Sequence, residues 1–179
     1  MGTALPGFDA PAVGFEQPYE MLAACHERVQ RSLDLLGRLV DHLDDKGHDA
    51  QTRSAAADVL RYFDIAAPLH HQDEELHVFP LLLRREDAPL HTVVSRLQAE
   101  HREMEVLWAL LRVAILRWQE PDCTDGVSAE LRAAIERFRG IYAGHIEAEE
   151  SQVFPAARVA MNQAKQEAMG REMQARRQG

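Results

Sequence analysis

Two short stretches of the sequence carry the side chains best suited to bind a metal. His70 is followed four residues later by Glu74, and His145 is followed at the same spacing by Glu149. On a helix, residues four apart lie on one face, about 6 Å apart along the axis. The imidazole and the carboxylate of each pair can therefore ligate one ion, or the carboxylate can bridge to a second ion.

The second stretch repeats the first after 75 residues (145 − 70), and a second pair of histidines obeys the same shift (101 − 26). The residues related in this way are His26 with His101, His70 with His145, and Glu74 with Glu149. A single His-x-x-x-Glu is weak evidence, because charged helices produce it by chance. Two copies in register, each with a further histidine, indicate a duplicated chain with one set of ligands in each half.

Imidazole combined with carboxylate suits iron, manganese or zinc rather than copper(I). A structural zinc site would be closed at four ligands, often with cysteine. We expect two ions, with His26 and His70 on one, His101 and His145 on the other, and both ions bridged by Glu74 and Glu149. Each ion then keeps open positions for an oxo or hydroxo bridge, water or dioxygen, which favours a pair of non-haem iron ions.

The composition excludes several other classes of protein. A net charge of −9 argues against binding nucleic acid or an anionic membrane. No apolar run reaches the length of a membrane span, and residues 1–17 lack the features of a signal peptide. Cys25 and Cys123 do not form a disulfide framework, so the sequence predicts a cytoplasmic protein.

Apolar residues recur at spacings of three and four along four long segments, which predicts helices over about 18–46, 50–78, 89–119 and 131–155. Short connections between them predict an all-α, antiparallel up-down-up-down four-helix bundle. We expect an extended N-terminal arm over 1–17, the bundle over 18–155 and a C-terminal helical extension over 156–179, either packed on the bundle or frayed.

Prolines are expected to interrupt these helices. Pro68 should bend the second helix or divide it into two, and Pro80 and Pro155 should end the second and fourth helices. The inner face of the second helix is predicted to continue from Glu74 to His77.

The ordered set of ligands resembles that of the hemerythrin-like family, whose HHE cation-binding domains carry His, His-x-x-x-Glu, His and His-x-x-x-Glu on four helices. The matching residues are His26, His70, Glu74, His101, His145 and Glu149, within 18–155. The resemblance implies a non-haem di-iron centre used for O₂ carriage, for sensing iron or oxygen, or for protection against oxidative and nitrosative stress.

The sequence also departs from that family's oxygen carriers. Those proteins place two histidines four apart on the third helix, whereas here His101 is followed at that spacing by Glu105. They space the last histidine and acid by five, which would select Glu150 rather than Glu149. Glu105 is therefore a seventh candidate ligand, His71 is its rival, and reversible O₂ carriage is disfavoured.

Three functions fit these observations. We favour a binding or sensing module for iron, O₂, peroxide or nitric oxide, rather than an enzyme, because no organic-substrate pocket or cofactor loop is evident. The alternative is a di-iron oxidoreductase, such as a peroxidase-like or iron-donating repair protein. A purely structural bundle with vestigial ligands is the third possibility.

Overall fold

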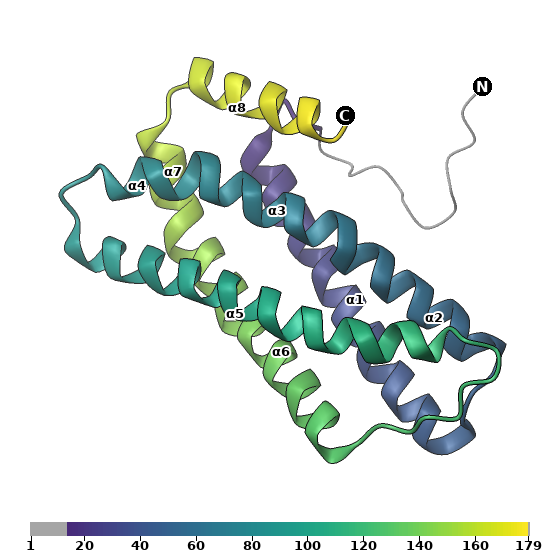
Figure 1. Cartoon of the computed structure of the whole chain (residues 1–179). Coiled ribbons are helices and arrows are strands. Elements are labelled where there is room, and N and C mark those ends of the chain that lie inside the picture. Colours follow the sequence, from purple (N-terminus) through teal and green to yellow (C-terminus); the bar gives the residue numbers. More distant parts are fainter. Residues whose placement is uncertain (1–13, 179) are drawn as a thin grey trace, which may run out of the picture.

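A computed structural model describes residues 14–178, and within that range the chain is built from helices (Figure 1). Most of the predicted N-terminal arm lies outside the described residues. The four long rods of the bundle are α1, the run from α2 to α4, α5, and the run from α6 to α7. The elements are α1 (Pro18–Lys46), α2 (Ala50–Arg61), η1 (Tyr62–Ala66), α3 (Ala67–Asp73), η2 (Glu74–Val78), α4 (Phe79–Leu83), α5 (Ala88–Trp118), α6 (Ala129–Ala148), η3 (Glu149–Val153), α7 (Phe154–Ala160) and α8 (Gln163–Arg176).

Local sequence signals explain where the long helices begin and end. Pro18 opens α1, where its missing N–H has no helical partner to lose, and Gly47 closes it with a φ of 74° that glycine adopts without strain. Asp49 caps α2 by accepting hydrogen bonds from the backbone of the first turn, and Asp87 caps α5 in the same way. The connections are short, so consecutive rods run antiparallel and the predicted all-α bundle is confirmed. None of the described helices combines the length and hydropathy of a membrane span.

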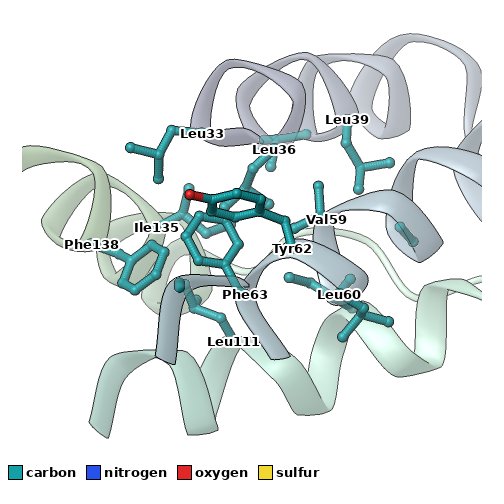
Figure 2. Packing of buried hydrophobic residues seen from close by; sticks show 14 of the residues in the cluster. Leu33, Leu36, Leu39, Val59, Leu60, Tyr62, Phe63, Leu111, Ile135 and Phe138 are labelled. Carbon is teal, nitrogen blue, oxygen red and sulfur yellow. The ribbon is translucent and has the colours of Figure 1, made fainter. Parts of the chain in front are cut away.

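The apolar core forms two clusters. The larger one includes Leu36, Phe63, Leu111 and Phe138, which pack together between α1, the second rod, α5 and α6 (Figure 2). The smaller cluster includes Leu22, Val78, Leu97 and Val153 from the same four rods. Along each rod, the candidate metal ligands other than Glu105 fall between residues of one cluster and residues of the other. The ligands therefore form a buried polar layer between two dry apolar regions.

Three short π-helical segments interrupt the rods, and each precedes a proline by the same interval. The segments η1, η2 and η3 begin six residues before Pro68, Pro80 and Pro155. In each, the N–H of the residue before the proline donates to the carbonyl of the segment's first residue, one position further back than in an α-helix. Because a proline ring clashes with the carbonyl four residues earlier, a wider turn lets the helix pass through the proline.

These wide turns correct three of the expectations. The helix continues past Pro80 to Leu83 and past Pro155 to Ala160, so neither proline ends its helix. The alternative that Pro68 divides the second helix is also wrong, because the rod stays helical from Ala50 to Leu83. Each π segment adds one residue to a turn, so the inward stripe moves from His77 to Val78 and Phe79, both fully buried. His77 points away from the centre of the bundle. Its side chain is 20% exposed and pairs with Glu172 of α8.

The C-terminal extension forms the helix α8, which packs on α1 at one end of the bundle (Figure 1). Arg176 and Arg177 both pair with the buried carboxylate of Asp73, the residue before Glu74. Gly170 allows the backbone of Phe15 to approach so closely that a Cβ at this position would overlap its carbonyl oxygen. The ion pairs with Asp73 hold α8 against the bundle next to the ligand layer. The alternative that this extension is frayed is therefore wrong.

Candidate metal centre

Six of the seven candidate ligands converge in the buried layer, and all six residues are 5% exposed or less. They form two groups in which one potential ligand atom from each residue lies within 4.8 Å of the others. The groups are His26, His70, Glu74 and Glu149, and Glu74, His101, His145 and Glu149. Both carboxylates belong to both groups, as two ions sharing a pair of bridges would require.

Glu74, the first residue of η2, reaches histidines of both groups. Its Oε1 lies 3.2 Å from Nε2 of His70, and its Oε2 lies 3.4 Å from Nε2 of His101. Burial and the neighbouring Glu149 carboxylate raise the pKa of Glu74 well above its usual value. This carboxylate therefore needs a positive partner in order to ionise.

Glu149, the first residue of η3, makes the equivalent contacts from the other half of the chain. Its Oε1 lies 3.2 Å from Nε2 of His145, and its Oε2 lies 3.1 Å from Nε2 of His26. Burial opposes ionisation of Glu149, but its close contacts with the imidazoles of His145 and His26 outweigh this effect and lower its pKa well below the usual value. The two carboxylates thus occupy one site with opposite pKa shifts.

The histidines also differ in their proton affinity. Burial opposes protonation of His26 and His145, but contacts with Glu149 and the charge of Glu74 raise the pKa of both. Burial and the charge of His26 lower the pKa of His70 well below its usual value. His70 is therefore a neutral imidazole, the form that ligates metals.

A second layer of carboxylates orients three of the imidazoles. The Nδ1–H group of each donates to a glutamate, which turns Nε2 toward the interior. The pairs are His26 with Glu150 at 2.8 Å, His101 with Glu75 at 2.9 Å, and His145 with Glu100 at 2.9 Å. Histidines held by a carboxylate on one nitrogen while the other faces a shared point are characteristic of metal ligands.

The interior atoms fit a cation. Among the described residues, both oxygens of Glu74, both oxygens of Glu149 and Nε2 of His26 are buried without a hydrogen-bond partner. The Nε2 atoms of His101 and His145 lie 3.0 Å apart, and their Nδ1 atoms already donate to carboxylates. In the neutral state two nitrogen lone pairs would therefore face each other. Unpaired buried acceptors of this kind are costly, and bound cations would satisfy them.

Glu105 is the candidate that does not join the site, because its side chain is exposed on α5 and belongs to neither group. Its rival His71 is buried and stacks on His101, with ring centroids 4.1 Å apart. Burial and the neighbouring histidines lower the pKa of His71 well below its usual value, and its Nε2 has no hydrogen-bond partner among the described residues. His71 is therefore a neutral nitrogen donor beside the second group.

Sequence reasoning missed the role of Glu100. Its contact with Nδ1 of His145 could not be found from the internal repeat, because the residue 75 positions earlier (100 − 75) is Cys25. Glu75 and Glu150, by contrast, are the supporting partners of His101 and His26 and obey the 75-residue shift.

Two comparisons relate the chain to known proteins. The profile of the Hemerythrin HHE cation binding domain matches residues 17–157, which contain all six converging ligands. A Haemophilus influenzae protein described as uncharacterized is 35% identical over 165 residues, a match that covers 92% of each chain.

Proposed function

The chain belongs to the hemerythrin HHE cation-binding family, and on that premise we propose that it holds two non-haem iron ions and uses them to bind or sense O₂, iron, or reactive oxygen and nitrogen species. One observation carries the proposal. Two fully buried carboxylates lie within ligand distance of imidazoles from both halves of the chain. Cation binding is the family's shared property, and the choice of iron rests on the oxygen-rich, histidine-containing donor set.

The roles of the residues follow from their contacts. His26 and His70 would hold one ion, His101 and His145 the other, and Glu74 with Glu149 would bridge them. Bound ferrous iron would supply electrons to O₂, peroxide or nitric oxide.

The protein surroundings shield this centre from bulk water. Phe154 stacks on His26 and Phe79 stacks on His101, in each case with ring centroids 5.5 Å apart. These two aromatic residues are themselves related by the 75-residue shift (154 − 79). Only small ligands would reach the centre, which supports a gas or peroxide rather than an organic substrate. We place this activity in the cytoplasm, because Cys25 and Cys123 are both free thiols.

A second candidate function, a di-iron oxidoreductase acting on peroxide, is favoured by His71. This buried neutral imidazole with an unpaired Nε2 lies beside His101 and could accept or return a proton during turnover.

Anaerobic reconstitution with ferrous iron, followed by optical spectra on addition of O₂ or peroxide, tests both functions. We expect two irons per chain and a spectral change that does not reverse when O₂ is removed, as oxidation of the ferrous centre would produce. Multiple turnovers of peroxide would instead identify the oxidoreductase. Failure to bind iron would contradict both functions.

A further inference from the structure

The four inner histidines are not equally supported. His101 and His145, which serve one group, both donate Nδ1–H to a carboxylate. In the other group His26 donates to Glu150, whereas Nδ1 of His70 is buried and has no hydrogen-bond partner among the described residues. The two groups therefore share their inner ligands by symmetry but differ in the layer around them.

The internal repeat shows where this difference arises. Glu100 supports His145, and the position equivalent to Glu100 in the first half of the chain is occupied by Cys25. A thiol is a weak acceptor, whereas a carboxylate accepts strongly from an imidazole N–H. Among the described residues, Nδ1 of His70 therefore lacks the carboxylate acceptor that Glu100 provides for Nδ1 of His145.

Two further differences act in the same direction. The Glu150 side chain that supports His26 is 49% exposed, whereas Glu75 and Glu100 are 34% and 18% exposed, so water competes more strongly for the contact of Glu150. His71 adds a buried imidazole beside His101 whose Nε2 has no hydrogen-bond partner among the described residues. The residue 75 positions later is Ile146, which cannot ligate.

A carboxylate on the outer nitrogen makes an imidazole a better ligand. It fixes the ring orientation and tautomer and increases the basicity of the ligating nitrogen, and its loss typically costs 10–100-fold in metal affinity. A histidine without such a partner must keep an unsatisfied buried N–H when its other nitrogen binds an ion.

We propose that the two ions are held unequally, and that the half-site of His101 and His145 binds its ion more tightly than the half-site of His26 and His70. This inference rests on the proposed di-metal function and adds the order in which the two ions bind. The tight site fills first, and the weaker site holds the exchangeable ion. Glu100 is the positioning residue that creates the difference, and Cys25 marks the position where the first half lacks it.

Anaerobic titration of the metal-free chain with Co²⁺, followed by visible absorption and by competition with a chelator, tests this inference. We expect two binding steps whose dissociation constants differ by about 10-fold or more. Glu100→Gln should weaken the tight step by about 10-fold and leave the weak step unchanged. Cys25→Glu, which installs the missing carboxylate, should strengthen the weak step.

Glu103→Gln is the matched control, because Glu103 lies on the same helix but pairs with Arg137 outside the centre. Two steps of equal affinity in the native chain, or a Glu100→Gln variant that weakens only the second step, would overturn the inference and leave the di-metal site intact. A native chain that binds no Co²⁺ would contradict the proposed function itself. If Cys25→Glu does not fold, as judged by circular dichroism, the Glu100→Gln and Glu103→Gln titrations decide the question.

Discussion

Nδ1 of His26 donates a hydrogen bond of 2.8 Å to the carboxylate of Glu150, although 124 residues separate the two along the chain. Moving His26 forward by 75 residues and Glu150 back by 75 gives the reciprocal contact, in which His101 donates to Glu75 at 2.9 Å. Each half of the chain therefore orients a histidine that belongs to the other half. The centre is complete only when both halves are packed together.

The buried and exposed glutamates allow a matched test of which acids ligate metal. Glu149→Gln should reduce iron to one ion or fewer per chain, because an amide cannot replace the bridging charge. Glu105→Gln makes the same chemical change at an exposed position and should leave two irons bound. Metal analysis and melting with and without iron measure both effects. The native chain should gain about 2.7 kcal/mol when free iron is 100-fold above the dissociation constant. Equal iron content in the two variants would refute this assignment.

The prolines after the π segments should affect metal binding only through the backbone geometry of the preceding turn. Pro80→Ala restores an N–H and removes the ring clash, so the turn that begins at Glu74 can tighten to an α-helix. Glu75 would then lose its reach to His101, and we expect Co²⁺ affinity to fall by about 10-fold. Pro89→Ala, in the first turn of α5, is the control and should bind normally. Unchanged affinity in Pro80→Ala would show that the proline does not position the site.

The ion pairs of α8 should stabilise the fold. Asp73 is fully buried and relies on Arg176 and Arg177 for its positive partners, so replacing both arginines by alanine leaves a buried charge without compensation. We expect a loss of about 3 kcal/mol in the free energy of unfolding, measured by urea denaturation. Arg171→Ala, an exposed change on the same helix, should cost less than about 0.5 kcal/mol. Equal midpoints for the two variants would mean that α8 contributes no such support.

Glu172 links the stability of α8 to pH. Hydrogen bonds from Arg176 and His77 lower the pKa of Glu172 from 4.5 to about 2. Because the pKa of this carboxyl is lower in the folded protein than in the unfolded chain, it stabilises the folded state at pH values above the unfolded-state pKa. This contribution is lost as the pH falls from 4.5 toward 2. Because the side chain is 41% exposed, we expect Glu172→Gln to cost at most about 1 kcal/mol at pH 7.

The difference in unfolding free energy between the native chain and Glu172→Gln should shrink below pH 4.5. Glu167→Gln, the same chemical change at an exposed position of the same helix, is the control for the substitution itself. A difference in unfolding free energy that stays constant down to about pH 3 would contradict the pairing of Glu172 with Arg176 and His77.

The all-α fold and the convergence of six ligands could be predicted because both follow from spacing. Stripes of apolar residues define helices, and a duplicated pattern places equivalent residues at equivalent heights in a bundle. The prediction included His26 and His101, which replace apolar residues in their stripes. Helix ends marked by Pro18 and Gly47 were also readable, because their backbone preferences are local.

The remaining features depend on packing and on distances between helices, which the spacing of residues along the sequence does not determine. A proline can end a helix or be absorbed by a wide turn, and packing on both sides of Pro80 and Pro155 favours the second outcome. The rotation of His77 toward Glu172 follows from that turn. Glu100 was not predicted, because its role has no counterpart in the repeat and depends on the distance between two helices.

Anomalous diffraction at the iron edge, from crystals of the chain loaded anaerobically with ferrous iron, would locate the two ions that we propose inside the bundle. We expect two peaks inside the bundle, both in contact with Glu74 and Glu149, one beside His26 and His70 and the other beside His101 and His145. Iron found only at surface carboxylates, or an interior without any peak, would contradict this proposal.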